Sequence, residues 1–156
     1  IGIPTTTVLG FARYDAGPGL CRVHVVTRFV PDAFDLGQVV AGLVPGLSVT
    51  EALNATQLLL ERLALGRVVH PDLNVKNVLL TRSTTGVSAM VIDVDVVTIT
   101  PDASFADTMQ RNATRLGRSL RKWRTQFGCD LSERDIARFL ADATSRANAT
   151  SGLGRA

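Results

Sequence analysis

Apolar residues recur at helical spacing over residues 49–65, and this is the clearest helical pattern in the chain. Ser48 and Glu51 form the signature of a capping box, which predicts the first turn, and Gly66 is placed to serve as the C′ residue. The leucines of this segment spread around most of the helical circumference: Leu53, Leu58, Leu59, Leu60 and Leu63. We therefore expect a helix that is buried on several sides.

Two further helices are predicted in the last third of the chain. From Asp107 an apolar stripe repeats at helical spacing and ends before Gly128. The stripe consists of Met109, Ala113, Leu116, Leu120, Trp123 and Phe127. The last helix is expected to begin at Ser132, with an inner face that consists of Ile136, Phe139, Leu140 and Ala143. Residues 149–156 are mostly small or polar, so we predict a frayed tail there.

Strand patterns dominate the first part of the chain. Val8–Tyr14 and Cys21–Val30 are rich in β-branched and aromatic residues and are joined by a turn at residues 15–19. A two-stranded ribbon is only marginally stable in water, so we expect this one to pair with further strands. A short helix is predicted around residues 36–43, and a second hairpin is predicted around the turn at residues 83–86.

Two groups of polar residues interrupt the apolar strands in the middle of the chain. The first consists of His70, Asp72, Asn74 and Asn77, and the second of Asp93 and Asp95. Polar groups between apolar strands cost desolvation energy unless they are paired or bind a metal. A carboxylate, an amide five residues later and a second carboxylate after the next hairpin are the parts that a phosphoryl-transfer site needs. Such oxygen ligands suit Mg²⁺.

Composition narrows the class of protein. The chain has 156 residues, of which 46% are hydrophobic and 20% charged, as expected of one globular domain. No apolar run approaches the roughly 18 residues of a spanning helix. Ile1 stands where an initiator methionine or a signal peptide would begin, so we expect a fragment whose true start is missing. The net charge of +3 favours an anionic partner weakly, and the 5% aromatic content argues against nucleic acid.

Two motifs carry a resemblance to a known family. HPDLNVKN (residues 70–77) and IDVD (residues 92–95) resemble the catalytic and metal-binding loops of the protein-kinase-like superfamily. The DLN form and the later RNATRLGRSLRKW (residues 111–123) are most similar to bacterial lipopolysaccharide kinases of the Kdo kinase group. Those enzymes use ATP to phosphorylate the sugar 3-deoxy-manno-octulosonic acid (Kdo) on lipid A. The resemblance covers roughly residues 20–127.

The resemblance implies a fold and a place in the cell. It implies an α+β, protein-kinase-like fold, mostly the helical C-terminal lobe plus the last strands of the N-terminal lobe. Residues 1–30 would end the N-terminal lobe, 31–47 would connect the lobes, and 48–148 would form the C-terminal lobe, followed by the tail. The protein would be cytoplasmic, and peripheral to the inner membrane of a Gram-negative bacterium.

The resemblance also implies roles for single residues. Asp72 would be the catalytic base, with His70 orienting the loop by hydrogen bonding. Asn77 and Asp93 would bind Mg²⁺, and ATP would be the phosphate donor. The backbone of Arg28, Phe29 and Val30 would meet adenine, and Asn74 would lie at the nucleotide.

Several of these residues have a plainer alternative. Asp72 and Asn77 could merely cap turns, although their spacing to His70 and Asp93 favours the kinase interpretation. Asp95 is either a second metal ligand or a turn cap. Lys76 either contacts the transferring phosphate as a point charge or is an ordinary exposed lysine.

The chain departs from the family pattern in two ways. Where Kdo kinases resemble DFD followed by a basic residue, this chain has Val94 and Val96. The Gly-rich loop, the strand lysine and its glutamate partner would lie before residue 1, so the chain alone should bind nucleotide poorly and should not turn over. The alternatives are a small-molecule kinase of the aminoglycoside or choline type and a non-catalytic kinase-like binding module.

Basic residues are concentrated in the helix that follows the two motifs. They are Arg111, Arg115, Arg118, Arg121, Lys122 and Arg124, and they lie largely opposite the apolar stripe. They could face the phosphates of lipid A or the inner leaflet, or they could form a solvated helix face. The acceptor would be Kdo-lipid A or another small molecule with a hydroxyl group. Trp123 follows the stripe and is predicted to be core.

Overall fold

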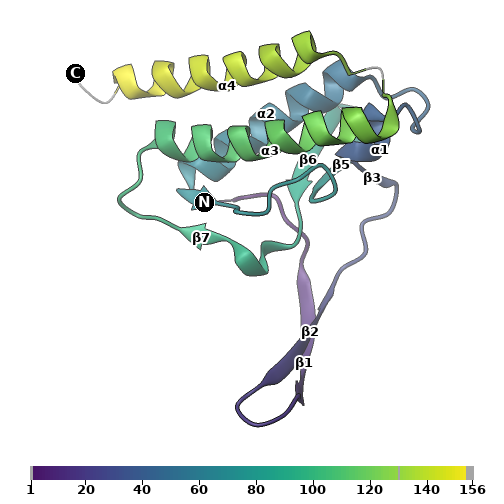
Figure 1. Ribbon diagram of the computed structural model, residues 1–156, viewed down its shortest axis with the longest axis vertical. Coiled ribbons are helices and arrows are strands. Elements are labelled where there is room, and N and C mark those ends of the chain that lie inside the picture. Colours follow the sequence, from purple (N-terminus) through teal and green to yellow (C-terminus); the bar gives the residue numbers. More distant parts are fainter. Residues whose placement is uncertain (1, 130, 154–156) are drawn as a thin grey trace.

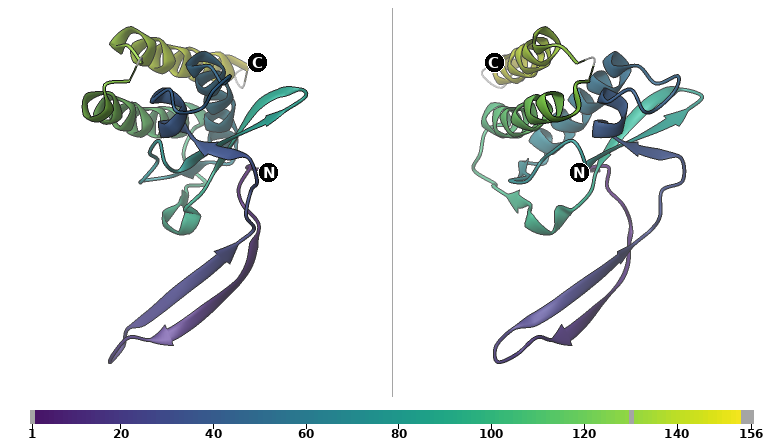
Figure 2. Two further views of the ribbon diagram at one scale, coloured as in Figure 1. Left: turned by 90° about the vertical axis from the view of Figure 1, so that its right-hand side faces the viewer. Right: turned by 45° about the vertical axis from the view of Figure 1, so that its right-hand side comes forward.

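A long β-ribbon projects from a compact body of helices and short strands (Figures 1 and 2). The computed structural model describes residues 2–129 and 131–153. The ribbon consists of β1 (Val8–Asp15) and β2 (Cys21–Thr27), which pair antiparallel. Every residue of β2 is exposed. The ribbon confirms the predicted hairpin, although its second strand ends at Thr27 rather than Val30.

The connection from the ribbon to the body carries two elements. They are β3 (Ala33–Asp35), which was not predicted, and α1 (Leu36–Val40), which is shorter than expected. Asp35 caps α1: its Oδ1 accepts from Gln38 N (2.8 Å), and its own N–H donates to Gln38 Oε1 (2.9 Å). This reciprocal box starts the helix directly after the strand.

The helix α2 (Val49–Leu65) begins with the predicted capping box. Its C-terminus differs from the prediction, since Gly66 keeps helical geometry (φ −79°) and Arg67 takes the left-handed conformation (φ 55°). A left-handed backbone conformation costs free energy in a residue other than glycine. The Arg67 guanidinium offsets this cost with hydrogen bonds to the carbonyls of Pro101 and Ala103. Thr100 N in turn donates to Arg67 O (2.9 Å).

The body is built around α2. Four of its five predicted core leucines are buried, but Leu58 is 53% exposed and was wrongly assigned to the core. One side of α2 packs on the hairpin of β5 (Val78–Ser83) and β6 (Gly86–Val91), and another packs on α3. The helix is therefore central but keeps one solvent-facing edge.

The strands form three small sheets. β3, β5 and β6 make an antiparallel sheet in that order, which confirms the predicted second hairpin. The other short pair is β4 (Val68–Val69) with β7 (Thr98–Ile99). Val91 N also donates to Pro4 O (2.9 Å), which ties the start of the chain to β6.

The helices α3 (Phe105–Phe127) and α4 (Glu133–Leu153) pack side by side over α2 (Figure 1). The N-cap of α3 is Ser104, so the helix begins before the predicted Asp107. It ends at Gly128 as predicted, because that residue takes the left-handed conformation (φ 56°). The stripe is buried as far as Leu120, whereas Trp123 is only half-buried and Phe127 is 57% exposed. Trp123, which was predicted to be core, is thus partly buried and packs against the core, and Phe127 lies at the exposed end of the stripe.

The last helix runs further than expected. Ile136, Phe139 and Ala143 are buried as predicted, but helical backbone continues through Leu153. The helix thus includes residues 149–153 of the tail that was predicted to fray, and the last three residues of that tail lie outside the described part of the chain. Over residues 2–129 and 131–153, the structure holds no helix with the length and apolar character needed to cross a membrane.

Candidate active site

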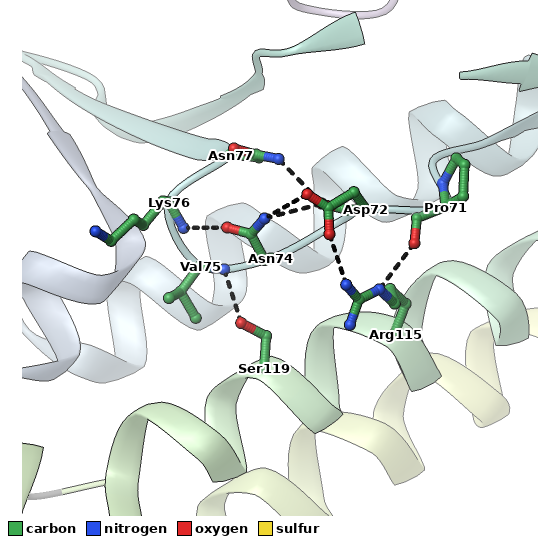
Figure 3. A network of polar contacts seen from close by, with 8 residues as sticks. All are labelled: Pro71, Asp72, Asn74, Val75, Lys76, Asn77, Arg115 and Ser119. Carbon is green, nitrogen blue, oxygen red and sulfur yellow. Dashed lines mark hydrogen bonds and ion pairs between the residues drawn. The ribbon is translucent and has the colours of Figure 1, made fainter. Parts of the chain in front are cut away.

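The loop between β4 and β5, residues 70–77, is irregular in conformation but firmly anchored (Figure 3). Leu73 and Val75 are almost fully buried. Because side chains alternate along the loop, Asp72 and Lys76 are turned outward and remain exposed. Val75 N also donates to Ser119 Oγ on α3 (3.1 Å). The loop is therefore held by its buried apolar side chains and by α3, while the side chains of Asp72 and Lys76 stay accessible.

His70 is completely buried beneath this loop. Its Nε2 lies 3.2 Å from Ile92 O, and since a carbonyl oxygen only accepts, Nε2 carries the proton in this contact. Its main-chain N–H donates to Asn112 Oδ1 (3.0 Å). The imidazole therefore ties the loop to the residue directly before Asp93. Its role in orienting the loop for catalysis stays a prediction.

Asn112 is a functional position that sequence reasoning missed. It is fully buried on α3, accepts from His70 N, and donates from Nδ2 to Val68 O (2.8 Å). The signal was available: Asn112 lies one helical turn beyond Met109 and one turn before Leu116, so a polar residue interrupts the buried face. A buried amide of this kind needs specific partners.

Both carboxylate oxygens of Asp72 are hydrogen-bonded, yet the side chain is 53% exposed. Oδ1 lies 2.6 Å from Arg115 Nη2, and Oδ2 accepts from Asn74 Nδ2 (3.2 Å). Arg115 Nε donates to Pro71 O (2.8 Å), so its guanidinium spans two consecutive residues of the loop (Figure 3). Arg115 is thus not a solvated arginine but a brace for Asp72.

Asn77 and Asp93 lie at the ends of neighbouring strands. The side-chain Nδ2 of Asn77 donates to Asp72 O (3.0 Å), and the main-chain carbonyl of Asn77 accepts from Ile92 N (3.0 Å). Asp93 follows Ile92 in the left-handed conformation (φ 61°) and is exposed. The structure therefore brings the first motif and the first acid of the second motif together.

The side-chain oxygens of Asn77 and Asp93 are ligands of the kind that Mg²⁺ prefers. No hydrogen bond within the described residues uses Asn77 Oδ1 or the Asp93 carboxylate, so both are available as ligands. No cluster of three or more His, Cys, Asp or Glu side chains suited to a metal occurs in residues 2–129 and 131–153. Mg²⁺ commonly takes only one or two protein carboxylates and completes its shell with phosphates and water. Asp95 lies in the following 3-10 turn (Val94–Val96), is exposed, and stays a predicted ligand.

Comparison with known proteins assigns the chain to a family. A model of the lipopolysaccharide kinase (Kdo/WaaP) family matches residues 1–142. The chain belongs to this family. Among solved structures it is similar to "WaaP in complex with acyl carrier protein", with a TM-score of 0.53 and 20% sequence identity over 94% of this chain and 69% of that chain. None of the curated proteins compared with the chain matches it.

The family match confirms the resemblance and extends it at both ends. It places the chain among kinases that act on lipopolysaccharide. The likeness to WaaP confirms the predicted mixed, kinase-like fold. The division into lobe, connector and tail stays a prediction.

Two other loop residues, Asn74 and Lys76, interact with protein groups nearby. Asn74 donates to Asp72 and accepts from Lys76 N (2.9 Å), so its amide is used within the loop, and contact with nucleotide stays a prediction. Lys76 Nζ lies 5.6 Å from the centre of the Trp123 ring. Its proposed contact with phosphate also stays a prediction.

The residues predicted to meet adenine lie away from these contacts. Arg28, Phe29 and Val30 belong to the connection between β2 and β3, where Phe29 is 84% exposed. Arg28 N donates to Thr7 O (2.8 Å), which closes the base of the ribbon. No hydrogen bond or ion pair joins these three residues to the loop at 70–77 in the described part of the chain.

Two grooves flank the Asp72–Arg115 pair. The larger, of about 510 Å³, lies between the loop and α3 and is lined by Asp72, Lys76, Lys122 and Trp123, among others. The smaller, of about 430 Å³, is lined by His70, Pro71, Asp107 and Arg111, among others. Arg115 and Arg118 line both grooves. An acceptor bound in the larger groove would therefore lie beside Asp72, and one in the smaller groove would lie beside its partner Arg115.

Proposed function

We propose that this protein transfers the γ-phosphate of ATP to a hydroxyl group of Kdo in the inner core of lipopolysaccharide. One observation carries the proposal: Asp72 is half-exposed at a groove, and its main-chain carbonyl is bonded to Asn77, which lies beside Asp93. A base, an amide oxygen and a second carboxylate are thus gathered where phosphoryl transfer needs them. Family membership supports the acceptor class.

Asp72 would accept the proton of the acceptor hydroxyl as that oxygen attacks phosphorus. The carboxylate is held in place by Arg115 and Asn74, so its direction is set before substrate binds. Preorganisation of this kind removes the cost of orienting the base in the transition state. Because Asp72 is half-exposed, a hydroxyl can approach it without displacing the loop.

Asn77 and Asp93 would hold Mg²⁺ on the nucleotide phosphates. When bound, the ion neutralises the charge that builds on the phosphate oxygens. His70 supports this geometry indirectly, because its ring bonds the carbonyl of Ile92 and so restrains the backbone that leads to Asp93. We also propose a cytoplasmic location at the inner membrane, where ATP and a lipid-linked sugar meet.

The test is transfer of labelled phosphate from Mg-ATP to Kdo-lipid A by the complete protein. Asp72→Asn removes the base but keeps the shape of the side chain, and it should lower kcat about 10²- to 10⁴-fold. Asp142→Asn makes the same change at an exposed position on α4 and should leave kcat as in the parent.

The possible failures lead to different conclusions. A folded parent that binds ATP but does not label Kdo-lipid A would reject Kdo as the acceptor. A folded parent that does not bind ATP would indicate a non-catalytic kinase-like module. Equal rates for the parent and Asp72→Asn would remove Asp72 from its proposed role.

A further inference from the structure

The basic residues of α3 separate into two sets according to their partners. Arg121 Nε and Arg124 Nη2 lie 2.7 and 3.4 Å from the carboxylate of Glu133, at the start of α4. These two arginines join helices. The other set consists of Arg111, Arg115, Arg118 and Lys122. They follow one another at steps of four, three and four residues, which places them in one row along the helix.

This row faces the catalytic loop. Arg111, Arg115 and Arg118 line the smaller groove, and Arg115, Arg118 and Lys122 line the larger one. Lys76 faces the row from the loop across the larger groove. The row therefore runs through both grooves and passes Asp72 at its middle.

Most of the positive charge in the grooves has no counterion among the residues that the structure describes. Arg115 is paired with Asp72, but Arg111, Arg118 and Lys122 make no ion pair among the described residues. Lys76 Nζ contacts only the face of Trp123. Asp72 is the single acid that lines the larger groove, and Asp107 the single acid that lines the smaller one. A concave surface with one sign of charge concentrates ligands of the opposite sign.

We propose that these grooves bind an acceptor saccharide that carries anionic groups on both sides of the hydroxyl that reacts at Asp72. The larger groove binds one group through Lys76, Arg118 and Lys122, and the smaller groove binds another through Arg111. The groups are phosphates or carboxylates, both of which accept the charged donors of lysine and arginine. This inference rests on the proposed function, because it takes Asp72 as the reacting centre.

The shape of the site favours a saccharide over a lipid bilayer surface. The cations line two open recesses of about 510 and 430 Å³ on either side of the Asp72–Arg115 pair. Trp123 lies in the wall of the larger recess, where an indole can pack against a sugar ring. A bilayer surface would meet a flat array of cations, and it would not reach the base of a groove.

The test compares single variants of the complete protein on a matched set of acceptors. Arg118→Gln and Lys122→Gln remove charge from the grooves, Lys122→Arg keeps it, and Arg138→Gln removes charge from exposed α4 as the control. The acceptors are Kdo-lipid A, its dephosphorylated form and its carboxyl methyl ester. Loss of one charged hydrogen bond should raise KM for Kdo-lipid A about tenfold in each glutamine variant, with kcat little changed.

The acceptor series identifies the anionic group that is bound. If phosphate is recognised, the dephosphorylated acceptor should have a high KM with the parent and show no further rise in the variants. If carboxylate is recognised, the methyl ester should behave in this way. An equal KM in parent and variants, or an equal rise on all three acceptors, would overturn the inference. The inference would also be overturned if the glutamine variants lost binding to phosphatidylglycerol vesicles while their KM stayed unchanged. That result would assign the row of basic residues to a membrane surface.

Equilibrium binding of Kdo-lipid A separates this inference from the proposed function. If the parent transfers no phosphate but binds Kdo-lipid A, and the glutamine variants bind it about tenfold more weakly, the function fails and the anionic groove stands. Equal binding by parent and variants, or no binding by the parent, overturns the groove.

Discussion

The β1–β2 ribbon and the loop at residues 70–77 are opposite in almost every respect. The ribbon is paired from Gly10 to Asp15 with one register shift between Val8 and Gly10, yet apolar residues such as Phe11 (75%) and Val25 (54%) are exposed. The loop has no regular structure, yet Leu73 and Val75 are buried and its polar groups reach residues more than forty positions away. Long-range contacts, rather than regular hydrogen bonding, hold a segment to the body.

Apart from substitutions in the apolar core, the largest structural effect should come from the buried amide under the loop. Asn112→Ala leaves His70 N and Val68 O without partners, so the free energy of unfolding should fall by about 2–4 kcal/mol. Chemical denaturation measures this change, and hydrogen exchange of the His70 amide should speed up most. Asn148→Ala makes the same change at an exposed position on α4 and should have little effect. Unchanged protection of His70 would contradict the bracing role.

A smaller effect is expected where α1 contacts α3, at Gly37 and Trp123. A Cβ on Gly37 would lie 2.8 Å from the Trp123 ring, so Gly37→Ala should displace the indole and lower the free energy of unfolding by about 1–3 kcal/mol. Trp123 is the only tryptophan, so its fluorescence reports the displacement directly. Gly10→Ala, where a Cβ meets nothing within 4 Å, is the control. An unchanged emission spectrum would show that α1 does not rest on Trp123.

The smallest effect is expected on the ribbon. Phe11→Ser should change the free energy of unfolding by no more than about 0.5 kcal/mol, because the ring is already in water. The same substitution at buried Phe139 should cost about 3–5 kcal/mol. A comparable loss at both positions would show that another surface covers the ribbon in solution and would erase the contrast with the loop.

Local signals in the sequence were enough for most elements. The capping box at Ser48 and the left-handed Gly128 each act within a few residues, and the structure has both where they were predicted. The two motifs were enough to predict the kinase-like fold, and together with residues 111–123 they were enough to predict the family. Periodicity was less reliable for burial, since it says nothing about depth: Leu58 and Phe127 fit their helical patterns but are exposed.

The contacts that shape the site could not be derived in this way. Asp72 and Arg115 are 43 residues apart, and His70 and Asn112 are 42 apart. Such pairs depend on how α3 lies over the loop, which no local pattern contains. For the same reason the sequence did not divide the six basic residues of α3 into sets. In the structure, two of them form ion pairs with Glu133 and the other four line the grooves.

Arg67 has a consequence for how this family can vary. By bonding the carbonyls of Pro101 and Ala103, and through Thr100 N, it closes the chain between residues 67 and 103 into a ring. Every residue proposed for proton transfer or metal binding lies on this ring. Insertions in the turn between β5 and β6 would lengthen this closed segment while Arg67 still holds its two ends together. The entropic cost of closing the longer segment grows only slowly with its length. Insertions at this turn would therefore leave in place the contacts of Asp72 and His70 with α3.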